Sequence, residues 1–254
     1  MSGAFTDRAF ADHFSAAAAD YASARPEYPA ALFDWITRTA PARSRVWEAG
    51  CGSGQASRAL AARFAQVYAT DPSAAQIAQA RAPGNVRFAV EPAERCSLAD
   101  ASADVVCVAQ ALHWFDRDAF FAECERVLRP GGALVVWGYQ DIEVPGPLQP
   151  ANDALQALIR DDWPPERADV DAAYAGYAWP FEPLSAPSFE LQAAWILPRL
   201  LAYFSSYSAS KQHRERTGID PVTVHAAEWL RTWGDPEATR IVRWPLFVHA
   251  RRKP

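Results

Sequence analysis

The sequence predicts an α/β protein built on a doubly wound, mostly parallel sheet of seven strands, with a small helical cap. Between residues 46 and 139, apolar runs rich in β-branched residues alternate with helical patterns. A glycine-rich turn follows the first of these runs, and the regularity ends after residue 139 in a region rich in Pro, Trp and Tyr. Alternation of this kind produces successive right-handed βαβ units, whose helices cover both faces of a parallel sheet.

The individual elements follow from the hydrophobic period of each segment. The expected strands are 45–50, 66–71, 86–90, 103–110, 131–139, 188–195 and 243–252. The expected helices are 57–64, 74–81, 119–128 and one long helical stretch over 195–216. The chain is therefore expected to divide into an N-terminal helical lid segment (1–40), a cofactor-binding core (41–140) and a region holding the helical cap and the last two strands (141–254).

Composition and charge exclude several classes of function. Half of the 254 residues are hydrophobic and 22% are charged, with a net charge of −5, which argues against a sequence-independent grip on nucleic acid. No run of eighteen apolar residues suggests a membrane span, and acids at the N-terminus argue against a signal peptide, so a cytoplasmic location is expected. The four cysteines form no CxxC pair and the five histidines no HExxH motif, so no metal is expected.

The segment "VWEAGCGSGQASRAL" holds the strongest motif. Its glycines are Gly50, Gly52 and Gly54, on alternate residues between a strand and a helix. A glycine turn in this position lets a ligand approach the backbone and the start of the helix. The dinucleotide fingerprint G-x-G-x-x-G fails here, because its third glycine would fall on Gln55 or Ser57.

Two acids near this turn indicate the chemistry of the ligand. Glu48 precedes the turn, where its charge suits a cationic amino group better than a pyrophosphate. Asp71 ends the second strand, where one carboxylate can accept hydrogen bonds from both hydroxyls of a ribose. The competing interpretations are a tight βα turn for the glycines and a helix cap for Asp71, since Pro72 and Ser73 follow it.

The pattern E-x-G-x-G-x-G resembles motif I of the class I S-adenosylmethionine-dependent methyltransferases. The segment "RVLRPGGALVVWGY" is similar to the helix, turn and fifth strand of that Rossmann-like fold. "FADHFSAAAADYASARPEYPAALFDWI", "AQALHWFD" and "LLAYFSSYSASKQHRERTGIDP" resemble the methyltransferase type 11 group, which includes trans-aconitate methyltransferase-like proteins. The resemblance implies S-adenosyl-L-methionine as cofactor, S-adenosyl-L-homocysteine as product, and methyl transfer as the reaction.

The cofactor half of the site is expected to extend beyond the motif. The resemblance assigns Glu94 to the adenine, with the backbone of Ala93 beside it, although a solvated loop acid is the competing interpretation. Gln110 follows the fourth strand, where an open α/β sheet presents residues to its ligand. The expected cofactor-binding residues are Glu48, Gly50, Gly52, Gly54, Asp71, Pro72, Ala93, Glu94, Gln110, Tyr21 and Arg25. Tyr21 and Arg25 lie in the lid segment, where a structural helix is the alternative.

The sequence gives fewer indications of the residues that bind the methyl acceptor than of those that bind the cofactor. His113 is the candidate general base if the acceptor is a hydroxyl or an amine, whereas a carboxylate acceptor needs no base. Packed residues that cover the sheet end are the alternative for His113 and Trp114. The expected substrate-binding residues are Trp114, Tyr139, Tyr203, Tyr207, Lys211 and Arg214. On one continuous helix, residues at spacings of four such as Tyr203, Tyr207 and Lys211 would share a face that could hold a small organic acid.

Three functions remain open at this point. A methyltransferase for a small molecule, with an organic acid carboxylate as the candidate acceptor, fits the acidic pI and the aromatic cap. A methyltransferase that acts on tRNA or protein would need a basic groove that the sequence does not show. A non-enzymatic module that binds S-adenosylmethionine is the third. The oligomeric state and the methylated atom are not evident from the sequence.

Overall fold

The computed structural model describes residues 26–254, which form two compact units. The sheet unit comprises residues 27–140, 168–191 and 245–254, and the helical unit comprises Pro26 together with residues 141–167 and 192–244. The change of unit between residues 140 and 141 coincides with one boundary of the sequence-based division, whereas residues 27–140 form one stretch of the sheet unit without a boundary at 40. Helix α2 (Ala30–Thr39) lies in the sheet unit because Leu32, Phe33 and Ile36 pack into its core.

The sheet has the order β3-β2-β1-β4-β5-β8-β6, with β7 paired to β8. The first five strands are parallel, and β8 runs antiparallel to β5. The strands are β1 (Arg45–Ala49), β2 (Gln66–Asp71), β3 (Val86–Val90), β4 (Ala103–Ala109), β5 (Leu128–Tyr139), β6 (Glu182–Leu184), β7 (Phe189–Trp195) and β8 (Arg240–Arg252). The mixed α/β, Rossmann-like prediction is therefore confirmed. The strand number differs from seven because of β6, whose three residues are too short to show a period.

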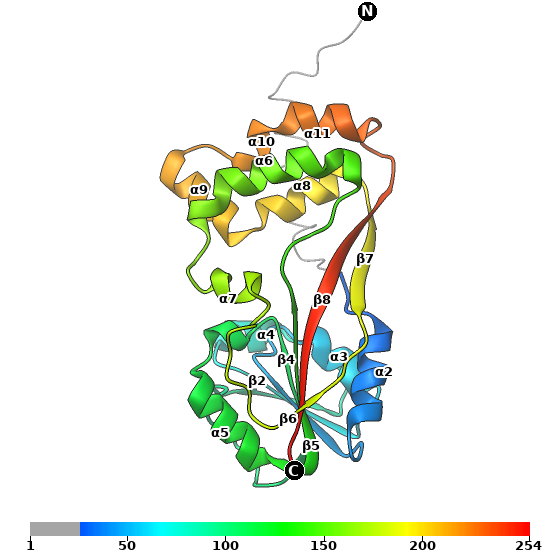
Figure 1. Ribbon diagram of the computed structural model, residues 1–254, viewed down its shortest axis with the longest axis vertical. Coiled ribbons are helices and arrows are strands. Elements are labelled where there is room, and N and C mark those ends of the chain that lie inside the picture. The colour runs from blue at the N-terminus through cyan, green and yellow to red at the C-terminus, as the bar shows by residue number, and fades with distance from the viewer. Residues whose placement is uncertain (1–25) are drawn as a thin grey trace, which may run out of the picture. The chain divides into compact units, whose positions relative to one another are not determined.

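Helices cover both faces of the parallel strands (Figure 1). Alternate residues of β1 show the division: Val46 packs with α2 and with α3 (Gln55–Ala61), whereas Trp47 packs with α5 (Arg117–Val127). Strands β1 and β4 in the middle of the sheet are buried almost throughout, which explains their largely apolar sequences, whereas the edge strand β3 has only half-buried and exposed residues. The remaining helices of the sheet unit are α4 (Ala74–Gln79) and the 3₁₀ turn η1 (Leu112–Trp114). The short helix α7 (Arg167–Asp171) begins at the end of the helical unit and continues into the sheet unit.

The helical unit contains the helices η2 (Gly146–Leu148), α6 (Gln149–Ile159), η3 (Arg160–Asp162), α8 (Leu197–Ser205), α9 (Ser208–Thr217), α10 (Pro221–Val224) and α11 (Ala226–Trp233). Apolar residues such as Leu155, Phe204 and Trp229 are fully buried, and the rings of Phe204 and Trp229 lie 5.3 Å apart. A polar connection joins α9 to η3, where the buried Asp162 accepts hydrogen bonds from Arg216 and pairs with Nδ1 of His213 at 2.7 Å.

The expected single helix over 195–216 is wrong, because two helices occupy this stretch. Helix α8 ends at Ser205, and Tyr207 precedes α9 with φ −62° and ψ 138°, which is extended backbone. Ser205 and Ser206 lie at the break, and serine is disfavoured inside helices because its side chain competes for backbone hydrogen bonds. Tyr203 and Tyr207 therefore do not occupy successive turns of one helix with Lys211.

Candidate functional site

The turn between β1 and α3 combines two packed glycines with one open one. Gly50, Gly52 and Gly54 have φ values of +68°, +54° and +84°, which only glycine adopts without strain. A Cβ on Gly50 would lie 2.7 Å from the Cβ of Ala111, and a Cβ on Gly54 would lie 2.9 Å from Cζ of Phe88. Among residues 26–254, a Cβ on Gly52 would meet a single atom, a side-chain oxygen of Gln76 at 4.0 Å. The first and third glycines thus serve packing, while this part of the chain leaves the backbone at Gly52 open to a ligand.

Glu48 lies beneath this turn in the interior of the sheet unit. Its side chain is 1% exposed, and the hydroxyl of Ser57 on α3 donates a hydrogen bond to it. Burial raises the pKa of Glu48 to about 8, while the hydrogen bond from Ser57 and the charge of Arg58 oppose that rise. A carboxyl group with this pKa can be protonated or ionised near neutral pH, depending on the charge that is brought beside it. The sequence analysis did not find Ser57, which becomes a partner because α3 packs on β1.

Asp71 at the end of β2 fixes the turn from the neighbouring strand. Oδ2 accepts a hydrogen bond of 2.9 Å from the amide of Gly52, and Oδ1 accepts one of 2.9 Å from the amide of Ser73. Each carboxylate oxygen has two lone pairs, so both retain capacity for hydroxyl donors. Ser73 itself is the N-cap of α4, and Pro72 between them is exposed. The carboxylate thus joins the turn after β1 to the end of β2, as expected from the parallel register of these strands.

Ala93 and Glu94, which were predicted to lie near the adenine, belong to the loop after β3. Glu94 has a structural role in this loop. Ala93 is buried in the core that includes α5. Oε1 of Glu94 accepts a hydrogen bond of 2.8 Å from the amide of Asp116, the N-cap residue of α5. The side chain of Glu94 is half-buried. Contact of either residue with an adenine stays a prediction.

Gln110 marks the end of β4 with strained backbone. Its φ is +54°, in the left-handed region that non-glycine residues rarely occupy. Its amide donates to the carbonyl of Trp137, and its Nε2 donates to the carbonyl of Tyr139 at 3.0 Å. The structure thus brings Gln110 and Tyr139 together, at the ends of adjacent parallel strands. Backbone strain held by several hydrogen bonds is common at functional sites.

His113 and Trp114 follow on the 3₁₀ turn η1. Trp114 is 60% exposed, so the interpretation as a packed tryptophan is wrong for this residue. His113 is half-buried, its ring lies 4.8 Å from that of Trp114, and its Nδ1 lies 2.8 Å from the hydroxyl of Tyr174. Sequence analysis missed Tyr174, since it lies 61 residues further along the chain and no motif connects the two positions.

The cations expected to hold an organic acid are not grouped with the tyrosines on one helix face. Lys211 is 71% exposed and lies 3.9 Å from Glu215, whereas Arg214 forms an ion pair of 2.8 Å with Asp220. The hydroxyl of Tyr203 accepts a hydrogen bond of 3.0 Å from Nε1 of Trp244. The substrate-binding roles of these residues stay predictions, without the continuous helix that motivated them.

Tyr207 has a partner on the segment that follows β5. Its hydroxyl donates to Oδ1 of Asp141 at 3.3 Å, and its ring lies 5.2 Å from that of Trp163. Burial raises the pKa of Tyr207, so the phenol remains a hydrogen-bond donor at neutral pH. The predicted lid residues Tyr21 and Arg25 lie outside the described residues.

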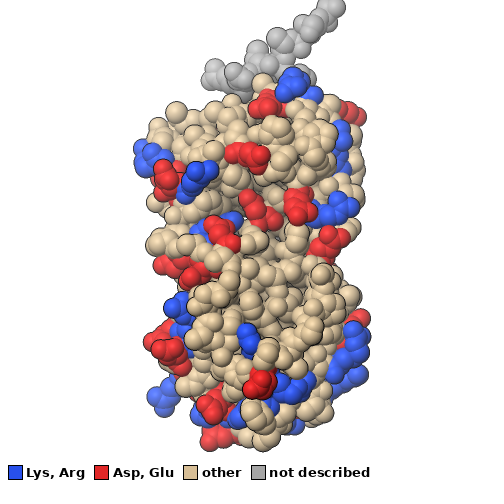
Figure 2. Space-filling view, viewed as in Figure 1, with Lys and Arg blue, Asp and Glu red and all other residues tan. Residues whose placement is uncertain are grey.

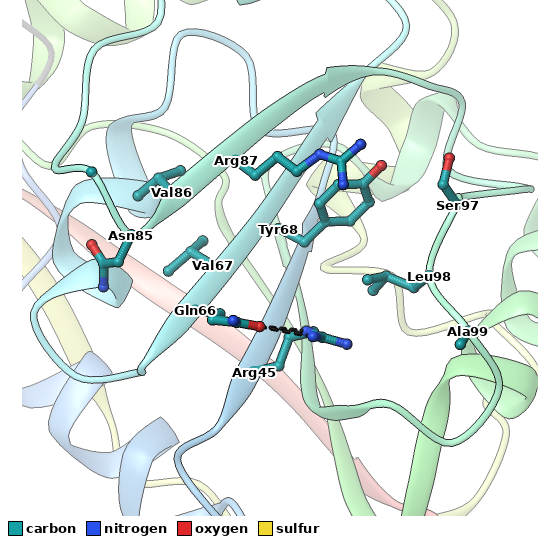
Figure 3. A pocket seen from close by; sticks show the side chains of 11 residues that line it. Arg45, Gln66, Val67, Tyr68, Asn85, Val86, Arg87, Ser97, Leu98 and Ala99 are labelled. Atoms are coloured by element: carbon teal, nitrogen blue, oxygen red, sulfur yellow. Dashed lines mark hydrogen bonds between the residues drawn. The ribbon is translucent and has the colours of Figure 1, made fainter.

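A cavity of about 470 Å³ lies at the opposite end of the strands (Figure 3). Arg45, Gln66 and Val86 line it from the starts of β1, β2 and β3, and Arg45 donates two hydrogen bonds to Oε1 of Gln66. Arg87 lies over the ring of Tyr68, 5.5 Å from its centroid (Figure 3). Open α/β sheets bind ligands beyond the carboxyl ends of their strands, so this cavity is not the candidate active site.

Comparison with known proteins shows the family to which this chain is similar. Residues 47–136 match a family described as a methyltransferase domain. A Dictyostelium discoideum protein described as a methyltransferase is 31% identical over 80% of this chain and 79% of its own length. A Mycobacterium bovis methyltransferase is 38% identical over about half of each chain.

Solved structures extend the similarity over the whole fold. A type II methyltransferase from Anaeromyxobacter dehalogenans shares 43% identity and has a TM-score of 0.86, over 90% of this chain and 98% of its own. The YcgJ protein from Bacillus subtilis shares the fold, with a TM-score of 0.52 at 16% identity. This chain belongs to the class I S-adenosylmethionine-dependent methyltransferases.

The residues of this chain fit the cofactor of that family. The open backbone at Gly52 leaves room that a side chain would fill, and Asp71 holds that backbone while keeping acceptor capacity on both oxygens. The buried Glu48 supplies an ionisable group below the same turn. A methionine amino group and a ribose are suitable partners for these acids.

Proposed function

We propose that this methyltransferase acts on a small molecule, with an organic acid carboxylate as its methyl acceptor. Cofactor binding is assigned to the turn after β1 together with Asp71, Glu94 and Gln110. The acceptor is assigned to the neighbouring ends of β4 and β5, where His113, Trp114 and Tyr139 lie. The observation that carries this assignment is the turn itself, where the open Gly52 is hydrogen-bonded to Asp71 at 2.9 Å.

The surface charge supports a small acceptor over a nucleic acid. Acidic and basic residues are interspersed over the face shown in Figure 2, and the whole chain carries a net charge of −5. A protein that grips nucleic acid without regard to sequence needs a concentrated positive surface. Among residues 26–254, no helix combines the length and apolar character needed to span a membrane.

The proposed chemistry demands positioning more than proton transfer. When bound, S-adenosylmethionine supplies a methyl group activated by its sulfonium, and a carboxylate acceptor can take it without losing a proton. The residues of this chain must then hold the acceptor oxygen in line with that methyl and exclude water. Gln110, fixed through both its main-chain amide and its side chain, is suited to hold the edge of the site rigid.

Methyl transfer to separate pools of candidate acceptors tests the proposal. The protein is incubated with S-adenosylmethionine labelled in its methyl group and with carboxylic acids, alcohols, amines, tRNA or protein. Base-labile label in the carboxylic acid pool is expected, because methyl esters hydrolyse in base. Asp71→Ala should abolish this transfer at a low cofactor concentration, whereas Asp34→Ala, which removes an exposed acid on α2, should not. Label in tRNA or protein alone would overturn the proposal.

A further inference from the structure

A turn with strained backbone follows α7. It places the side chain of Tyr174 next to His113, which lies just after β4. Ala173 and Tyr174 have φ values of +48° and +57°, so two successive non-glycine residues adopt the left-handed conformation. Backbone hydrogen bonds maintain them, from Ala173 to the carbonyl of Val170 at 2.8 Å and from Tyr174 to that of Asp169 at 2.9 Å. Strain of this kind persists only where the surroundings determine it, and it is frequent at functional sites.

The surroundings of this turn are aromatic and closely packed. Tyr174 is fully buried, and its ring stacks on Tyr177 at 5.0 Å and meets the edge of Phe247 at 5.1 Å. Nε2 of His249 lies 2.7 Å from the carbonyl oxygen of Ala173, and the His249 ring stacks on Trp179 at 4.4 Å. A carbonyl oxygen can only accept, so His249 donates from Nε2 and fixes the backbone next to Tyr174. The position of the Tyr174 ring is thus determined from several sides.

The hydroxyl of Tyr174 ends 2.8 Å from Nδ1 of His113. Burial raises the pKa of Tyr174, so the hydroxyl keeps its proton at neutral pH. A buried hydroxyl proton needs an acceptor, and Nδ1 of His113 is the one that the described part of the chain supplies. If Nδ1 carried a proton instead, the Tyr174 oxygen would accept and its own proton would be left buried without a partner. The favourable arrangement therefore has Tyr174 donating to Nδ1.

We infer that Tyr174 is a positioning residue that holds neutral His113 in the tautomer with its proton on Nε2. In a neutral imidazole one nitrogen donates and the other accepts, so a bond received at Nδ1 places the proton on Nε2. In this tautomer His113 can donate a hydrogen bond from Nε2 but cannot remove a proton there. The role assigned to His113 changes accordingly, from a general base to a hydrogen-bond donor.

This inference rests on the proposed function. It gives a chemical reason for a carboxylate as the methyl acceptor rather than an alcohol or an amine. A donor at Nε2 suits an acceptor with lone pairs and no proton to lose, which describes a carboxylate. One carboxylate oxygen can accept from Nε2 while the other takes the methyl group. An alcohol or amine acceptor would instead need a group that removes its proton, and His113 in this tautomer does not supply one.

Nitrogen-15 NMR of the histidine rings tests the tautomer without any turnover. The His113 signals are assigned by comparison with His113→Gln, at a pH where the ring is neutral. In the native protein, Nδ1 should have the shift of an unprotonated nitrogen and Nε2 that of a protonated one. In Tyr174→Phe the two shifts should move toward each other as both tautomers become populated. Tyr177→Phe is the matched control, because it removes a neighbouring phenol that stacks on Tyr174, and the His113 shifts should stay native.

The NMR spectra can either support or overturn the inferred tautomer of His113. A protonated Nδ1 in the native protein, or His113 shifts that are identical in Tyr174→Phe, would overturn the inference. Native-like spectra for the remaining residues of Tyr174→Phe would show that the variant is folded. If Tyr174→Phe does not fold, the shifts of the native protein alone still decide which nitrogen carries the proton.

Kinetics with the identified acceptor give an independent test of the coupling. Tyr174→Phe should lower kcat about five- to tenfold and leave KM for S-adenosylmethionine unchanged, because the hydroxyl acts on His113. In a His113→Gln background the same substitution should change kcat by less than about twofold, since its target is absent. Equal effects in the two backgrounds would indicate a purely structural role for Tyr174. Failure to find turnover would contradict the proposed function while leaving the NMR test intact.

Discussion

The two ends of the parallel sheet differ in what they offer a ligand. The amino ends of β1 to β3 surround a cavity of about 470 Å³, yet Arg45 there already donates to Gln66. The carboxyl ends hold the positive-φ backbone of Gly52 and Gln110 and the carboxylate of Asp71. We therefore assign the cofactor site to the carboxyl ends because of their backbone geometry and the acceptor capacity of Asp71.

The largest expected effect concerns the carboxylate that holds the glycine turn. Asp71→Ala should weaken binding of S-adenosylmethionine at least about tenfold, and up to several hundredfold, because charged hydrogen bonds contribute about 1.5–3 kcal/mol each. Titration calorimetry measures the affinity. At the other end of the sheet, Arg45→Ala should leave it unchanged. If Asp71→Ala and Arg45→Ala lost equal cofactor affinity, the two ends of the sheet would not differ in cofactor binding.

Glu48 should make stability depend on pH. Its pKa is raised to about 8 in the folded protein, from 4.5 for an unperturbed glutamate, so the folded protein holds a proton that the unfolded chain releases between these values. Native stability should therefore fall as pH rises through this window, by on the order of 1.4 kcal/mol per pH unit. Glu48→Gln replaces the ionisable carboxyl group by an amide, so the stability of this variant should not show this fall with pH.

Urea unfolding at pH 5 and pH 8 measures this effect. The native protein should lose stability between the two values, and Glu48→Gln should be the more stable of the pair at pH 8. Parallel curves for the two proteins across this range would show that Glu48 does not titrate as its burial requires.

Two glycines provide a matched comparison of the two ends. Gly52 and Gly84 both have room for a Cβ, but Gly52 has a positive φ and lies in the turn, whereas Gly84 lines the cavity at the amino ends. Gly52→Ala should reduce cofactor affinity about tenfold, because strain displaces the turn and the methyl occupies ligand space. Gly84→Ala should bind the cofactor like the native protein. The reverse order of affinities would place the cofactor at the amino ends.

The smallest expected effect lies in the helical unit. Lys211 is 71% exposed and lies 3.9 Å from Glu215, so Lys211→Ala should change the free energy of unfolding by less than about 0.5 kcal/mol. Arg214→Ala breaks a closer, less exposed ion pair and should cost somewhat more. The two variants also test the predicted acceptor roles. A higher KM for a carboxylic acid with unchanged cofactor affinity would support them, and an unchanged KM would exclude them.

The predictable part of the molecule is the part governed by local pattern. Strands β1 to β5 are short runs rich in apolar residues and the turn carries its own glycines, so short stretches of sequence contain the necessary information. The break before Tyr207 was missed because apolar spacing continues through two serines. The contact between Tyr174 and His113 was unpredictable for another reason. It depends on a strained turn and on packing between segments 61 residues apart.

A crystal structure of the complex with S-adenosylhomocysteine tests the central claim most directly. The account predicts that the ribose hydroxyls lie within hydrogen-bonding distance of Asp71, that the amino acid part lies against the backbone at Gly52, and that Arg45 has no ligand contact. A ligand bound among Arg45, Gln66 and Arg87, with the backbone at Gly52 untouched, would contradict it.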